Sequence, residues 1–157
     1  ELLHLGGLYA DTATARSAAA QALASGAAAE RFGRMVADLG GPADVLRDPR
    51  LPVAPVQRAV PAPRPGFVGA VDVRALGLAV VALGGGRRRP GDAVDPRVGL
   101  AAVLAPGAAV QAGDALALVH AASAADAETA VRAVTAALPV VDRPAPQTPL
   151  LLDRVRA

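Results

Sequence analysis

The apolar positions of residues 1–41 follow a helical period. Residues Glu1–Leu5 are predicted to be the last turns of a helix that Gly6 and Gly7 close. Asp11 stands where it can cap a second helix, running from Thr12 to about Ser25. A third helix is predicted from about Ala27 to Leu39, where the apolar side chains recur at i, i+3, i+4 and i+7: Phe32, Met35, Val36 and Leu39. Three short helices cannot bury all their faces alone, so we expect them to pack on a segment that lies upstream.

Proline dominates the next segment, Pro49–Pro65, which holds six prolines in seventeen residues. This composition is typical of an extended connector with polyproline character. We therefore predict a domain boundary here, with a helical part over 1–48, a connector over 49–65 and a second folded part over 66–157.

From Gly66 onward, short apolar runs between turn residues predict strands, and the predicted fold class of this half is α+β. Ser123 and Asp126 form a capping box that opens a helix to about Ala137. Its apolar face is Ala127, Val131, Val134 and Leu138. The predicted strands are Phe67–Val71, Leu78–Leu83, a short strand within 105–114, Ala115–His120, Val140–Val141 and Leu150–Val155.

The stretch 76–99 carries the most distinctive pattern. An apolar run, Leu78–Leu83, ends in three glycines, and Arg87–Arg89 then precede Asp92 and Asp95. We interpret it as a buried strand, a glycine turn with positive φ and a polar loop held by its own ion pairs. The functional alternative is an arginine site for a phosphate or carboxylate group.

Composition narrows the function classes. All 16 basic residues are arginine and the net charge is only +2. Despite the high isoelectric point, the chain is therefore not expected to have a positive electrostatic potential strong enough to attract nucleic acids in general. The absence of lysine excludes a carrier module with a lysine-bound biotin or lipoyl group, and the absence of cysteine excludes disulfides. We find neither a signal peptide nor a transmembrane span. Because the chain begins at Glu1 within an apparent helix, we expect it to be part of a longer protein.

Taken in order, these segments resemble the C-terminal part of thymidine phosphorylase and the related pyrimidine-nucleoside phosphorylases. The residues that carry the resemblance are Ala24–Ala27, Phe32, Met35, Gly40–Gly41, Gly66–Val68, Leu83–Arg87, Asp92, Asp95, Val98–Gly99, Val110, Gly113, Leu116 and Val119–Ala121. The resemblance implies that 1–48 is the helical tail of the family's large α/β domain, and that 66–157 is its C-terminal α+β module of the hammerhead kind.

The resemblance also implies a reaction: reversible phosphorolysis of a pyrimidine nucleoside, in a cytoplasmic homodimer. The family's phosphate signature and base-binding residues lie upstream of the matched region, and their lysine roles cannot be filled here. We therefore expect no catalytic, cofactor-binding or metal-binding residue in this chain, no cofactor, and partners limited to the rest of the phosphorylase. The isolated chain is predicted to be inactive.

Other chemistry is weakly supported by the sequence. His120 at a strand end and His4 between leucines are each expected to have structural roles, because neither has an identifiable acid–base partner. Asp92 and Asp95 together with loop carbonyls could bind a cation, but the three adjacent arginines argue against it. The remaining alternative function is a nucleotide- or nucleic-acid-binding module that uses Arg87, Arg88 and Arg89.

Overall fold

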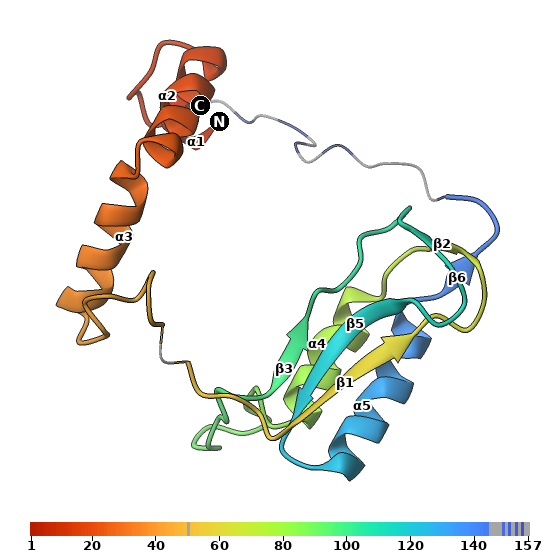
Figure 1. Cartoon of the computed structure of the whole chain (residues 1–157). Coiled ribbons are helices and arrows are strands. Elements are labelled where there is room, and N and C mark those ends of the chain that lie inside the picture. Colours follow the sequence, from red (N-terminus) through yellow and green to blue (C-terminus); the bar gives the residue numbers. More distant parts are fainter. Residues whose placement is uncertain (50, 145–148, 150, 152, 154, 156–157) are drawn as a thin grey trace. The chain divides into compact units, whose positions relative to one another are not determined.

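The computed structural model describes residues 1–49, 51–144, 149, 151, 153 and 155 (Figure 1). The chain divides into two compact units, Glu1–Leu51 and Pro52–Ala157, which we call unit 1 and unit 2. The two units are built differently. In the described residues, unit 1 is helical, whereas unit 2 combines two helices with two small sheets.

Unit 1 contains the three predicted helices, α1 (Leu2–Leu5), α2 (Thr12–Ala24) and α3 (Ala27–Asp38). Asp11 caps α2, because its Oδ1 accepts a hydrogen bond of 2.7 Å from the Thr14 amide. Gly26 and Gly40 take φ values of +82° and +85°, where a side chain would be strained. These starts and stops confirm the predicted helices to within one or two residues.

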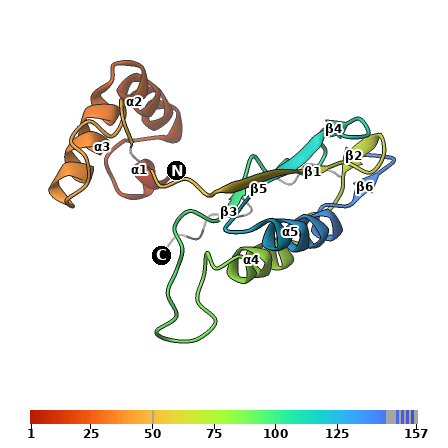
Figure 2. The same cartoon turned by 60° about the horizontal axis from the view of Figure 1, so that its bottom comes forward.

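Unit 2 has two three-stranded antiparallel sheets. Sheet A has the order β1–β5–β3 and is formed by Val56–Pro61, Ala115–Ala121 and Gly99–Ala101. Sheet B has the order β4–β2–β6 and is formed by Ala109–Val110, Gly66–Val68 and Val140–Val141. Helices α4 (Val73–Ala82) and α5 (Ala124–Ala137) lie side by side, and α5 packs against β1 and β5 of sheet A (Figure 2).

The core of unit 2 lies between these helices and the sheets. Its largest fully buried side chains are Leu116, Leu138, Val60, Val68, Val119 and Val134. In the antiparallel register Val60 pairs with Ala117 and Arg58 with Val119, so alternate residues of β1 and β5 share the face toward α5. Alanines on α5 supply the small partners that let the helix approach the sheet closely.

The apolar run Leu78–Leu83, predicted as a strand, is instead the C-terminal half of α4 with its cap residue. The Asp72 carboxylate starts this helix by accepting from the Ala75 amide at 2.9 Å. Ala79 and Leu83, one turn apart, are both buried. The strand prediction was wrong because a six-residue apolar run fits a buried helix as well as a buried strand.

The interpretation of Pro49–Pro65 as a connector is wrong for its second half, because Val56–Pro61 is strand β1. This strand pairs with β5 at the edge of sheet A, where proline is tolerated. Arg64 then ties the following loop to β6, donating to Asp142 Oδ1 at 2.6 Å and to the Val140 carbonyl at 2.7 Å. The division into 1–48, 49–65 and 66–157 otherwise stays a prediction.

The remaining elements of unit 2 largely follow the sequence. β5, β6 and the short strand β4 are confirmed, and α5 begins after the Ser123 cap as predicted. The first predicted strand is shorter than Phe67–Val71, since β2 ends at Val68, and β3 had no predicted counterpart. The predicted strand Leu150–Val155 lies largely outside the described residues. The α+β class is confirmed.

Candidate functional site

The candidate site is the segment that follows α4, which we call the arginine loop (residues 84–97). Gly84 has φ +95°, and the amides of Gly84 and Gly85 bond to the carbonyls of Val81 and Val80 at 3.1 and 3.0 Å. These two hydrogen bonds form a Schellman motif at the C-terminus of the helix. A side chain on Gly85 would lie 2.9 Å from Val80 Cγ1 and 3.2 Å from the Val98 carbonyl. The glycines therefore allow the loop to turn tightly against the core.

Asp92 holds the loop through the main chain. Its Oδ2 accepts hydrogen bonds from the backbone amides of Arg88 at 3.0 Å and Arg89 at 2.9 Å. Arg87 Nε donates to the Asp92 carbonyl at 3.2 Å. The predicted hold on the loop by ion pairs is therefore not what Asp92 provides, because its carboxylate binds main-chain amides. Within the described residues, the side chains of Arg87, Arg88 and Arg89 have no carboxylate partner.

The loop does contain one ion pair, formed by Asp95 with a fourth arginine, Arg97. Arg97 Nε and Nη2 donate to the two carboxylate oxygens at 2.9 and 2.8 Å, and the Arg97 amide donates to Oδ1 at 2.9 Å. These bonds from the Arg97 side chain and amide lower the pKa of Asp95 to about 2, and they raise the pKa of Arg97. Both carboxylates of the loop are thus engaged in fixing its shape.

A shallow hollow of about 400 Å³ lies beside the loop. It is lined by Val81, Ala82, Gly84, Gly86, Arg88, Asp92 and Ala93. Arg88 contributes a cation that can bind an anionic group, whereas the Asp92 carboxylate next to it opposes a second negative charge. The hollow has the chemistry of a weak anion contact.

Of the two histidines, His4 lies in unit 1 and His120 lies in unit 2, the unit that contains the arginine loop. His120 is partly buried on β5, where it pairs with Gln57 of β1 and Gly99 of β3. The ring of His4 is hydrogen-bonded through Nδ1 to the Tyr9 carbonyl at 3.0 Å. Neither ring contacts a hydroxyl or a carboxylate among the hydrogen bonds of the described residues. The structural roles predicted for both stay predictions.

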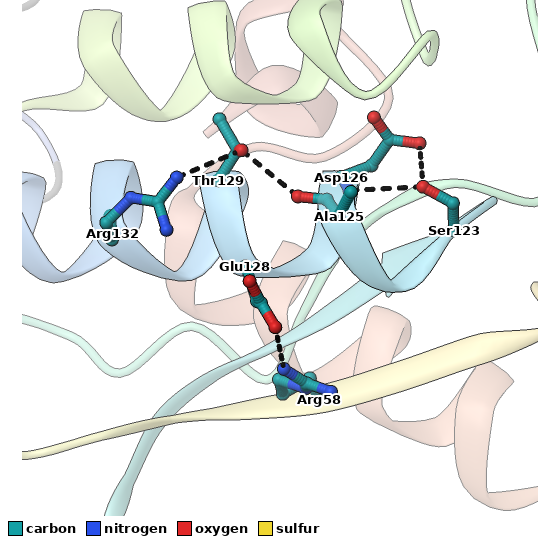
Figure 3. A network of polar contacts seen from close by, with 7 residues as sticks. All are labelled: Arg58, Ser123, Ala125, Asp126, Glu128, Thr129 and Arg132. Carbon is teal, nitrogen blue, oxygen red and sulfur yellow. Dashed lines mark hydrogen bonds and ion pairs between the residues drawn. The ribbon is translucent and has the colours of Figure 1, made fainter.

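A second group of polar residues surrounds the start of α5 (Figure 3). The Ser123 hydroxyl accepts from the Asp126 amide at 3.1 Å and donates to Asp126 Oδ2 at 2.6 Å. The Thr129 hydroxyl donates to the Ala125 carbonyl at 3.0 Å and accepts from Arg132 at 3.2 Å. These bonds stay within the helix and its cap, so the Ser123 hydroxyl is committed to starting α5.

One contact in this group joins two elements. Arg58 on β1 approaches Glu128 on α5 with an Nη1–Oε1 distance of 3.5 Å, and both side chains are largely exposed (Figure 3). An exposed pair of this kind stabilises a fold by no more than about 1 kcal/mol. The pair joins the edge strand to the helix at the surface of unit 2.

The described residues contain no group of three or more His, Cys, Asp or Glu side chains that could hold a metal ion. No helix among them is long and apolar enough to cross a membrane. The prediction that the chain carries no catalytic, cofactor or metal residue is tested by neither observation and stays a prediction. The arginine loop remains the strongest local feature.

Comparison with known proteins points to one family. Residues 67–140 match the family described as "Pyrimidine nucleoside phosphorylase C-terminal domain". "Thymidine phosphorylase" of Burkholderia cenocepacia (strain HI2424) is 57% identical over 136 residues, which are 85% of this chain and 31% of the relative. "Thymidine phosphorylase" of Mesorhizobium japonicum is 52% identical over 139 residues, 87% of this chain and 32% of the relative. The chain thus spans about a third of the length of these curated relatives.

Proposed function

We propose, on the premise that residues 67–140 belong to the family of pyrimidine nucleoside phosphorylase C-terminal domains, that this chain works as the C-terminal portion of a thymidine phosphorylase. The observation that supports the proposal best is the identity of more than half of the residues over 136 positions with proteins of that name. In this proposal the complete enzyme converts thymidine and phosphate to thymine and 2-deoxyribose 1-phosphate. It acts as a cytoplasmic homodimer.

The proposed contribution of this chain is structural. Phosphate attacks the anomeric carbon of the sugar while the base leaves, and the barrier is lowered mainly by positioning the two substrates and excluding water. The chain has no lysine, and in the described residues no hydroxyl group is hydrogen-bonded to a histidine. In this proposal the reacting groups come from the remaining portion of the enzyme, and this chain supplies a rigid body against which that portion closes.

A chimeric enzyme tests this proposal. This chain replaces the matched third of Burkholderia cenocepacia thymidine phosphorylase, and thymine release from thymidine is measured with and without phosphate. We expect the chimera to release thymine only when phosphate is present, whereas the isolated chain releases none. The matched control is the chimera with Leu116→Asp, which places a charge in the core of unit 2 and should abolish activity together with folding.

Two results would contradict the proposal. A chimera that is folded, as judged by a cooperative thermal transition, but that releases no thymine would show that this chain cannot serve as the missing portion. Thymine release by the pure isolated chain above a protein-free blank would show that the reacting groups lie within it.

The second candidate function is an arginine-mediated nucleotide or nucleic-acid site. The observation that favours it is the engagement of the Asp92 carboxylate by main-chain amides, which leaves the guanidinium groups of Arg88 and Arg89 exposed. This function predicts binding of a short oligonucleotide that weakens steeply with salt and is lost in the double variant Arg88→Ala/Arg89→Ala. Binding that is absent at low salt, or unaffected by the double variant, excludes it.

A further inference from the structure

We propose that the arginine loop binds a single phosphate group, as the free ion or as a phosphate ester, through the guanidinium groups of Arg88 and Arg89. The proposal rests on the second candidate function and deepens it by naming the ligand chemistry of that site. The loop connects α4 to β3 at one end of unit 2 (Figure 2).

The excess positive charge of the chain is concentrated in this loop. Residues 84–97 contain four arginines and two aspartates, a formal charge of +2, which equals the net charge of the whole chain. Because the charges outside the loop cancel, the loop is the segment whose net charge attracts an anion. A phosphate monoester carries a charge of about −1.5 to −2 at pH 7, so one such group balances the charge of the loop.

The loop is held by bonds to its main chain, and the guanidinium groups of Arg88 and Arg89 take no part in holding it. The Asp95 amide donates to the Gly84 carbonyl at 3.0 Å and closes the base of the loop. Asp92 Oδ2 accepts from the amides of Arg88 and Arg89 at 3.0 and 2.9 Å. Within the part of the chain that the structure describes, neither guanidinium group has a hydrogen-bond partner. The backbone therefore fixes the origin of both side chains, and their donors stay available to a ligand.

The loop also provides space for a ligand beside one of these arginines. Arg88 lines the hollow of about 400 Å³ together with Gly84 and Gly86, where the absence of side chains leaves room near the backbone. A guanidinium group presents a planar fork of donors that matches two oxygens of a phosphate group. Both arginines are exposed, so water and salt screen the contact, and we expect a dissociation constant in the millimolar range.

The Asp92 carboxylate favours one phosphate group over a longer polyanion. It lines the same hollow as Arg88 and opposes a second negative charge there. A nucleic acid strand gains affinity by contacting several phosphates at once, each neutralised by its own Lys or Arg. Since the charges of the remaining chain cancel, the loop has a net charge for one phosphate group, and a nucleic acid is the less favoured ligand.

An NMR titration of the 157-residue chain tests the proposal. Inorganic phosphate and thymidine 5′-monophosphate are added in separate experiments, with sodium chloride adjusted to keep the ionic strength constant. We expect saturable shifts of the Nε–Hε signals of Arg88 and Arg89. The signal of Arg74, an exposed arginine on α4 outside the loop, should shift little and without saturation. Tighter binding of the monophosphate identifies an ester as the preferred ligand, whereas equal or weaker binding identifies the free ion.

Two double variants separate a phosphate site from an effect of charge alone, with binding followed by the amide signals of Gly86 and Ala93 in the hollow. Arg88→Ala/Arg89→Ala should abolish saturation without changing the unfolding midpoint of unit 2, because the amides that bond to Asp92 remain. Arg88→Lys/Arg89→Lys keeps the charge but loses the forked donors, and it should weaken binding at least about five-fold. The control Arg74→Ala should leave the affinity unchanged within about two-fold.

Three results would overturn the proposal. The first is a shift of Arg88 and Arg89 by the two phosphate probes that is no larger than the shift of Arg74. The second is a lysine double variant that binds as tightly as wild type, since charge alone would then account for binding. The third is an oligonucleotide that shifts these signals when neither phosphate probe does, which leaves the second candidate function standing. The titration contains no other portion of the phosphorylase, so its failure does not affect the first proposed function.

Discussion

The two units use similar apolar residues in opposite ways. Unit 2 joins strands that are far apart in the sequence, such as β1 with β5, and the side chains of Val60, Val119 and Val134 have no exposed surface. Unit 1 consists of helices that follow one another directly in the sequence, and among its described residues only Ala15 is buried. An amphipathic pattern thus predicts which face will be buried, but it does not say whether the covering partner lies in the same unit.

The largest difference between the two units should appear in the loss of stability when one leucine of each is replaced by alanine. Leu116 has no exposed surface in sheet A, and we expect Leu116→Ala to lower the free energy of unfolding of unit 2 by about 2–5 kcal/mol through the cavity it leaves. Leu23 on α2 is 75% exposed, so Leu23→Ala should change stability by no more than about 0.5 kcal/mol. Urea titration followed by the amide NMR signals of β5 and α2 measures both. Equal losses in the two variants would contradict the comparison.

A pair of glycine substitutions should have opposite signs in the two units. At Gly66, with φ +153°, an added Cβ would lie 2.6 Å from the Val141 carbonyl oxygen and 2.8 Å from Val140 Cγ1. Gly66→Ala should therefore destabilise unit 2 by about 1–3 kcal/mol by pushing β2 away from β6. Gly33→Ala meets open space on α3 and should stabilise that helix by up to about 1 kcal/mol.

Thermal unfolding of unit 2 and the helical circular dichroism signal at low temperature measure these two effects. A stabilising effect of Gly66→Ala, or a destabilising effect of Gly33→Ala, would contradict the comparison.

The smallest effect should be a pH dependence at Asp95. Hydrogen bonds from Arg97 lower the pKa of Asp95 from 3.8 to about 2 in the folded chain. A lowered pKa stabilises the fold above pH 3.8, and this stabilisation is lost as pH falls toward 2. Asp95→Asn should therefore lower the unfolding midpoint of unit 2 at pH 6, and the difference from wild type should vanish near pH 2. If the midpoints of Asp95→Asn and wild type differ by the same amount at every pH, the effect of the substitution arises from packing and not from the charge of Asp95.

The sequence was most informative where one residue type has one local role. Asp11 and Ser123 were recognisable as helix caps because their side chains accept from an amide three residues later, in a pattern that needs no tertiary contact. Glycine at positive φ marked the ends of α2 and α3 in the same way. The direction of the apolar face of α5 was also predictable, since Ala127, Val134 and Leu138 are all buried.

The wrong predictions concern segments whose secondary structure or side-chain partners depend on tertiary contacts. The Leu78–Leu83 run forms a helix because Asp72 starts it and Ala79 and Leu83 pack on α5, neither of which follows from hydropathy alone. β1 was hidden by the prolines around it, and its pairing with a strand about 60 positions later is a non-local contact. In the arginine loop, the charges suggested ion pairs, and Asp95 does form one with Arg97, whereas the Asp92 carboxylate bonds to main-chain amides, which every residue type except proline has.

The position of β1 has a mechanical consequence. Only residues 52–55, two of them proline, separate the end of unit 1 from the first residue of this strand. The hydrogen bonds between β1 and β5 run perpendicular to the strands, so a pull on this short connection along the axis of β1 would load them together in shear.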